Sequence, residues 1–295
     1  MYPKNKRSYW LRAFMISYAL AFIILCFFAF LAVAALMPQE KLTYEEEISV
    51  YLPESTDKRT VMLLFLNEEQ QPLGCTLLSF NALRQEIPIT TLPAQSILTC
   101  FSDSYTISEL FLDGGISRVE DGIEQTFSIT VDGYMQMDSQ VLPAAMDAVG
   151  PLEFYMPFTL KHAALSPAEI SEGLQLFTGQ QLYSVIAFPA YTGGEEVRCK
   201  LISELSAAFI DQYLPLIGTE QVDRIFKSAI NEVKTDISFK DFEDFKEALC
   251  FLHQILDGPN GRRLTYAITP DGIFSQDLQT FTLSQNSILK LGALL

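Results

Sequence analysis

The feature that most constrains this 295-residue chain is an uninterrupted apolar run close to its start. Residues 13–37 (AFMISYALAFIILCFFAFLAVAALM) contain no charged side chain, and Ser17 is the only plainly polar one. As a helix rising 1.5 Å per residue, this run would be roughly 37 Å long, more than the bilayer's apolar thickness of about 30 Å. We therefore expect one membrane-spanning helix. No later stretch approaches 18 apolar residues, which excludes a channel or a transporter.

The alternative for this run is a cleaved signal peptide, and residues 32–34 (AVA) do resemble a cleavage site of small residues. Signal peptides, however, have apolar cores of only about 7–15 residues, so we expect an uncleaved signal anchor. Four bases precede the run, whereas the acidic residues begin after it, at Glu40. By the positive-inside rule, the N-terminus is then cytoplasmic and the rest of the chain is extracytoplasmic. The expected parts are a tail at 1–12, the anchor at 13–37, a juxtamembrane stalk at 38–59 and one domain at 60–295.

The part of the chain beyond the anchor is strongly acidic. It holds all 36 Asp and Glu residues but only 16 of the 20 Lys and Arg residues, which leaves a net charge of −20. Proteins that bind DNA or RNA rely on Lys and Arg to neutralise phosphates. Nucleic acid is therefore excluded as a partner.

Strand-like and helical patterns alternate along this acidic part. The strands are expected at 60–66, 73–81, 86–92, 128–134 and 151–156, and the helices at 106–112, 116–127, 138–149, 195–213, 220–233 and 239–256. Near the end, residues 264–269 and 273–277 flank Pro270-Asp271-Gly272, a pattern that predicts a closing hairpin. This order predicts an α/β fold in one domain, with a mixed central sheet flanked by helices.

The residue types that usually carry chemistry form no recognisable motif. The chain has no phosphate-binding loop, dinucleotide fingerprint, HExxH or GxSxG. His162 and His253 have no second ligand at helical spacing, so no metal site is predicted. Four dispersed cysteines follow the anchor, and they could form two disulfides by three pairings or remain as buried thiols. They are Cys75, Cys100, Cys199 and Cys250.

The order of the elements nevertheless resembles the LytR-CpsA-Psr (LCP) family of bacterial cell-envelope proteins, from about residue 60 to residue 213. The best match is at 128–157 (SITVDGYMQMDSQVLPAAMDAVGPLEFYMP), where Asp147-Ala148-Val149-Gly150 occupies the family's "lvdalGGv" turn. Residues 176–182 (LFTGQQL) are similar to the family's "L.G.qAL" segment, and residues 233–238 (VKTDIS) to its "v.TDls" stretch.

The resemblance implies a known chemistry, whose residues are mostly replaced here. The family transfers glycopolymers from a polyprenyl-diphosphate lipid to peptidoglycan, or hydrolyses such diphosphates, with an apolar groove, a divalent cation and several arginines. Where it has Ser-Ile-Pro-Arg-Asp, Arg-x-Arg and Ser-Asp-Thr, this chain has 91–95 (TLPAQ), 187–189 (AFP) and 74–76 (GCT). Of its final arginine pair and glutamine, only Arg198 matches, and Leu201 and Ile202 occupy the other positions.

Three hypotheses follow. The first is a degenerate, non-catalytic protein that binds a lipid-linked or wall component in cell-wall glycopolymer biogenesis. Its groove would be lined by side chains that are otherwise ordinary core, namely Phe154, Met156, Leu174, Leu176 and Phe177. The second is an active phosphotransferase or pyrophosphatase with a relocated site, in which Mg²⁺ would act with Arg198, Lys200 and either Asp103 or Asp113. The third is a regulatory or scaffold protein that contacts another envelope protein.

All three hypotheses share one location and one fixed partner. We expect a single-pass protein of the bacterial cell membrane whose residues 13–37 contact the bilayer. A polyprenyl-linked lipid or an envelope protein would be the further partner. Only the active form would require a cofactor.

Overall fold

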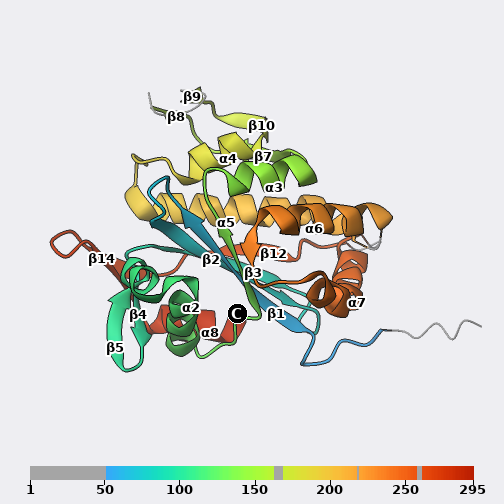
Figure 1. The fold of residues 1–295 in the computed structure, drawn as a ribbon, viewed down its shortest axis with the longest axis horizontal. Coiled ribbons are helices and arrows are strands. Elements are labelled where there is room, and N and C mark those ends of the chain that lie inside the picture. Colours follow the sequence, from blue (N-terminus) through green and yellow to red (C-terminus); the bar gives the residue numbers. More distant parts are fainter. Residues whose placement is uncertain (1–50, 163–168, 218, 258–260) are drawn as a thin grey trace, which may run out of the picture. The chain divides into compact units, whose positions relative to one another are not determined.

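The computed structural model describes residues 51–162, 169–217, 219–257 and 261–295 (Figure 1). The predicted tail and anchor, and the stalk as far as residue 50, lie outside these residues. In the part of the chain that is described, no helix is both long enough and apolar enough to cross a membrane.

The centre of the fold is a six-stranded mixed sheet, as predicted, with the order β11-β6-β1-β2-β3-β12. The pairs β1/β2, β2/β3 and β6/β11 are antiparallel, whereas β1/β6 and β3/β12 are parallel. The strands are β1 (Lys58–Leu66), β2 (Pro72–Asn81), β3 (Ile87–Pro93), β6 (Gly133–Met137), β11 (Lys234–Thr235) and β12 (Thr265–Ile268).

Helices cover both faces of this sheet, because alternate side chains of a strand point to opposite sides. On β2, Cys75 and Leu77 face α2 (Ile107–Phe127) and α8 (Gln285–Leu294). Leu78 points to the other face, toward α5 (Gly194–Tyr213) and α7 (Phe239–Asp257). In Figure 1, α5 and α6 (Glu220–Glu232) lie above the sheet and α2 and α8 lie below it.

Smaller elements surround this core. The helices α3 (Val141–Val149) and α4 (Gly179–Ile186) lie on the α5 side, and the 3-10 turn η1 (Leu214–Leu216) follows α5. Four two-stranded ribbons complete the described fold. They are β4 (Ile97–Cys100) with β5 (Asp103–Thr106), β7 (Leu152–Met156) with β10 (Gly173–Phe177), β8 (Leu160–Lys161) with β9 (Glu169–Ile170), and β13 (Gly272–Ser275) with β14 (Thr280–Leu283).

The local signals for α2 and α3 are largely confirmed. Thr106 and Glu109 form a capping box at the start of α2, where a helix is expected from residue 106. Gly114 and Gly115 have non-helical backbone angles, with a φ of 71° at Gly115, so α2 consists of two helical segments that match the helices expected at 106–112 and 116–127. Gly150 ends α3 at a φ of 124°, a conformation that favours glycine.

Two predicted elements are wrong. Residues 264–269 and 273–277 do not pair with each other: β12 joins β3 in the central sheet, and β13 pairs with β14. The turn of the observed hairpin lies at 276–279, after β13, and the parallel ladder beside β3 depends on residues nearly 180 positions away. The strand expected at 128–134 begins only at Gly133, because Ser128 adopts a left-handed helix cap and the Asp132 carboxylate accepts a hydrogen bond from the Thr60 backbone N–H.

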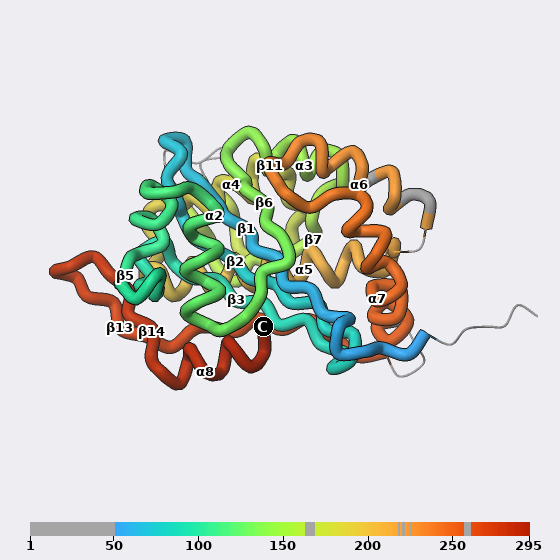
Figure 2. Tube along the Cα trace, turned by 60° about the horizontal axis from the view of Figure 1, so that its bottom comes forward, coloured from blue at the N-terminus to red at the C-terminus, as the bar shows by residue number. Residues whose placement is uncertain are grey.

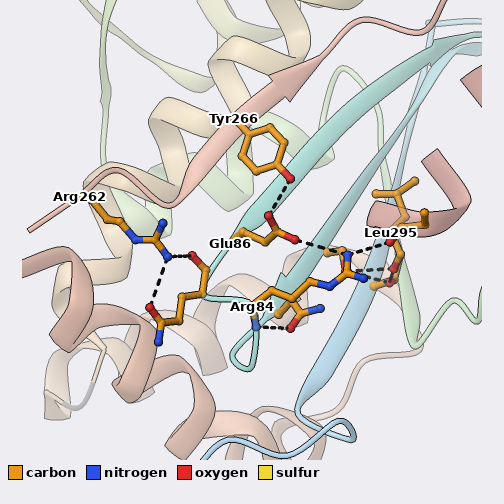
Figure 3. Close-up of polar contacts among 10 residues, drawn as sticks. Arg84, Glu86, Arg262, Tyr266 and Leu295 are labelled. Atoms are coloured by element: carbon orange, nitrogen blue, oxygen red, sulfur yellow. Dashed lines mark hydrogen bonds and ion pairs between the residues drawn. The ribbon is translucent and has the colours of Figure 1, made fainter. Parts of the chain in front are cut away.

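The last residue fastens α8 to the sheet. Leu295 is fully buried, and its carbonyl oxygen accepts hydrogen bonds from the Thr60 hydroxyl (2.8 Å) and the Ser79 hydroxyl (3.1 Å). Arg84 reaches the same helix end and donates to the Ala293 carbonyl oxygen at 2.8 Å (Figure 3). Strands β1 and β2 are thereby bonded to residues more than 200 positions away in the sequence.

Candidate functional site

A large apolar cavity of about 700 Å³ lies between the sheet and the helices α3, α5, α6 and α7. Strand β1 provides its floor, because Arg59, Val61, Leu63 and Phe65 are alternate residues and point to the same face. The helices add mainly aliphatic and aromatic walls, which include Leu142, Met146, Ile202, Leu205, Phe209, Ile230, Phe242 and Phe245. The lining can accommodate a long apolar chain.

The two ends of this cavity differ in exposure and in charge. Around the end of β1 the lining side chains are buried, including Phe65, Leu182 and Ile202. The lining residues that are exposed are Asp132, Asp241 and Asp244. These carboxylates are thus the exposed part of the lining.

The side chains predicted to line a groove lie outside this cavity. Met156 and Phe177 are fully buried and belong to a core cluster against which Phe154 packs. Leu174 and Leu176 are exposed, at 67% and 62%. On β10 these two leucines point away from the body, since they alternate with inward-facing residues. The lining instead comes from β1 and from helices far apart in sequence, which no local pattern links.

Arg198 is held in a buried ion pair. It is 5% exposed, and its guanidinium donates to the Glu195 carboxylate, one helical turn earlier, and to the Leu73 carbonyl oxygen. These contacts neutralise its charge and join α5 to the start of β2. Arg198 does not line the cavity.

The other residues proposed for a relocated active site are not assembled around Arg198. Lys200 pairs with Glu204 on the exposed side of α5, at 3.9 Å. Asp113 pairs with Arg118 on α2 at 3.3 Å, and Asp103 begins β5, which packs against α2. Because α2 and α5 cover opposite faces of the sheet, these groups cannot act on one substrate atom.

A neutral network of hydroxyl groups lies between the sheet and α5. The Thr76 and Thr91 hydroxyls are 2.8 Å apart, and the Ser203 hydroxyl donates to Thr91 at 2.8 Å. All three side chains are at most 1% exposed. Sequence patterns did not indicate this network, because it joins β2, β3 and α5.

The divalent cation that the family implies does not fit these residues. Cys75, at the position of the family's aspartate, packs into the core on the α2 side, where burial raises the pKa of its thiol. The described residues contain no group of three or more His, Cys, Asp or Glu side chains that could hold a metal ion. The described residues therefore provide no site for that cation.

Aromatic side chains gather where the family has Arg-x-Arg. The ring of buried Phe188 lies 5.1 Å from that of Tyr191 and 6.0 Å from that of His162. The Tyr191 hydroxyl donates to the Val185 carbonyl oxygen at 2.6 Å, and burial raises its pKa. This cluster offers ring faces and edges, not charged donors.

The four cysteines that follow the anchor form no disulfide in the described part of the chain. Cys75, Cys100, Cys199 and Cys250 are all free thiols, and the first three are buried. Burial raises the pKa of Cys199 to about 12, so this thiol is protonated at neutral pH.

Comparisons with known proteins give a consistent fold but no close sequence relative. No protein-family model matches the chain, and no curated protein is significantly similar to it. Solved structures do match. A protein from Eubacterium siraeum DSM 15702 is 20% identical, with a TM-score of 0.71 over 85% of this chain and 95% of that one.

Two further matches are LCP-family enzymes of B. subtilis. TagV is 13% identical, with a TM-score of 0.66 over 80% of this chain and 95% of its own. TagT, solved bound to LI-WTA, is 13% identical, with a TM-score of 0.60 over 83% of this chain and 92% of its own. The chain therefore has an LCP-like α/β fold.

Proposed function

We propose that this protein is a membrane-anchored, extracytoplasmic protein of cell-wall glycopolymer biogenesis that binds the apolar chain of a lipid-linked component without catalysing its transfer. The observation that carries the proposal is the cavity of about 700 Å³ between the sheet and α3, α5, α6 and α7. The fold it shares with TagV and TagT, the latter solved bound to LI-WTA, supports the cell-wall assignment. The anchor at 13–37 would hold the domain beside the membrane that supplies such lipids.

The absence of transfer chemistry is inferred from the side chains at the family's signature positions. Removing one group that stabilises developing charge typically slows a reaction by about 10² to 10³. Here Cys75, Ala94 and Ala187 are among the residues that stand where the resemblance places charged side chains. Arg198, which does match, is neutralised by Glu195. The net charge of −20 beyond the anchor further disfavours an anionic diphosphate.

The proposal is tested with the full chain in phosphatidylcholine nanodiscs and a polyprenyl phosphate that carries a photoreactive group on its chain. We expect crosslinks, mapped by mass spectrometry, on the peptides that line the cavity. The absence of cavity crosslinks at high micromolar lipid would refute the binding function.

A second measurement tests the absence of catalysis. The same protein is incubated with a polyprenyl diphosphate and Mg²⁺, and phosphate release is followed. We expect no release above the level without protein. Metal-dependent release would establish an active enzyme, and if it survived Arg198→Ala, Arg198 would be excluded from its site.

A further inference from the structure

The floor of the cavity has a defined length. Its lining residues on β1 extend from Arg59 to Phe65, and at about 3.3 Å per residue of a strand these two residues are about 20 Å apart. Figure 2 shows α7 beside the start of β1, from which the strand runs across the molecule. One leaflet of a bilayer, half of an apolar thickness of about 30 Å, is about 15 Å deep. The floor is therefore slightly longer than a lipid chain that spans one leaflet.

The volume of the cavity sets a second limit on its ligand. A methylene group occupies about the volume of a water molecule in the liquid, which is about 30 Å³. A cavity of about 700 Å³ therefore has room for about 23 carbon atoms. Polyprenyl chains are built from five-carbon isoprene units, so the cavity encloses about four to five of these units.

The cavity ends against packed side chains at Phe65. This residue is 4% exposed and lines the cavity, but it also belongs to the core cluster that contains Met156 and Phe177. Met156 and Phe177 are fully buried and are not part of the lining. The contact between α3 and α4 is close as well, since a Cβ on Gly179 would lie 2.5 Å from the Cα atom of Pro143. A chain that reaches Phe65 therefore meets a filled core instead of further space.

We propose that the cavity limits the length of apolar chain that the protein recognises. It encloses about four to five isoprene units of a polyprenyl lipid, and Phe65 determines where the enclosed part ends. The inference rests on the proposed function, since it uses the same cavity, and it adds the length of the recognised chain and a residue that sets this length. Once the cavity is full, further units bury no additional apolar area in it and stay outside.

The test uses the full chain in phosphatidylcholine nanodiscs and a set of polyprenyl phosphates with eleven isoprene units. Each probe carries one photoreactive group on a different unit, and crosslinks to cavity peptides are mapped by mass spectrometry. We expect about four to five consecutive positions to label these peptides. A labelled stretch of fewer than about three units or of more than about six would overturn the inference while leaving lipid binding intact.

Two variants change the size of the cavity in opposite directions. Phe65→Ala removes six carbon atoms, about the size of one isoprene unit, and a packed core relaxes only partly around such a truncation. It should add about one labelled position and extend labelling to the peptide that contains Met156. Ala229→Phe adds six carbon atoms on α6 inside the cavity and should remove about one position. This second variant tests the limit even if Phe65→Ala does not fold.

The matched control is Phe274→Ala, which removes the same six atoms from β13, outside the cavity lining. It should leave the labelled stretch at its original length. A stretch of equal length in the unmodified protein, Phe65→Ala and Ala229→Phe would overturn the inference. The absence of cavity labelling at every position of the chain would instead count against the proposed function itself.

Discussion

The Ser203 hydroxyl on α5 lies 2.8 Å from the Thr91 hydroxyl on β3, in a part of the fold from which water is excluded. Thr91 in turn lies 2.8 Å from Thr76 on β2, and Ser203 also donates to the Cys199 carbonyl oxygen. A helix and two strands are thus joined through neutral groups. Such a network stabilises the fold and provides no charge for catalysis.

Replacing Thr91 with valine removes the shared hydroxyl with little change in shape. We expect the free energy of unfolding to fall by about 1–3 kcal/mol, because the buried Thr76 hydroxyl loses its partner. Urea denaturation measures this loss. The double variant Thr76→Val/Thr91→Val should cost less than the sum of the single variants, and strict additivity would contradict the bond between them.

Filling the cavity should weaken lipid binding. Ala229 lines it from α6, and Ala229→Phe would place a ring in the space for the chain. We expect the affinity for a polyprenyl phosphate to fall about tenfold, since inserting extra volume into an occupied space typically costs about 1–3 kcal/mol. The control is Leu174→Ser, on the exposed face of β10, which should bind as the unmodified protein does. The reverse result would favour the groove predicted from sequence.

Arg198 should act as a structural residue. Arg198→Leu leaves the Glu195 carboxylate and the Leu73 carbonyl oxygen without their donor. Because Glu195 is partly exposed, we expect a loss of about 2–3 kcal/mol in the free energy of unfolding, below the range for a fully buried pair.

Two further variants test whether the stability lost in Arg198→Leu comes from the unpaired Glu195 carboxylate or from the loss of a side chain on α5. Arg198→Leu/Glu195→Leu should recover part of the lost stability, because no carboxylate is then left unpaired. Lys200→Leu, which breaks only the exposed pair with Glu204, should change stability by less than about 0.5 kcal/mol. An equal loss in Arg198→Leu and Lys200→Leu would contradict the structural role.

Tyr266 should make stability depend on alkaline pH. Its hydroxyl donates to the Glu86 carboxylate at 3.1 Å (Figure 3), and burial together with the charge of Glu86 raises its pKa to about 12. The fold thus favours the neutral phenol. Its contribution is fully present below the ordinary pKa near 10 and is lost as the pH rises toward about 12.

The contribution of Tyr266 is isolated by comparison with Tyr266→Phe, because burial also raises the pKa values of Tyr51, Tyr183, Tyr191 and Tyr213. Denaturation curves between pH 9 and 12 should show a smaller alkaline loss of stability in Tyr266→Phe. The absorbance titration of ionising tyrosines should lack one late component in that variant. Identical curves for the two proteins would disprove the Tyr266–Glu86 contact.

Much of this fold could be predicted from local sequence. Short apolar runs bounded by polar or proline-containing segments identified β1, β2 and β3, because a strand with both faces buried appears in the sequence as a continuous apolar run. Helical spacing of apolar residues identified α5, α6, α7 and the two segments of α2. The sequence also indicated that uncharged residues stand at most positions that the resemblance aligns with the charged signature of the LCP family. This comparison depends only on which residue types are present.

The site itself could be decided only by the tertiary structure. Phe154, Met156, Leu174, Leu176 and Phe177 formed a plausible apolar set, yet whether such side chains line a cavity, fill a core or face solvent depends on what packs against them. Likewise, the sequence contains Arg59, Asp132 and Asp244 at separations of tens of residues, without a motif to connect them. All three line one cavity because β1 pairs in parallel with β6 and α7 packs over Arg59. Local patterns determined the elements and the missing charges, whereas long-range pairing determined where the cavity lies and which charges face it.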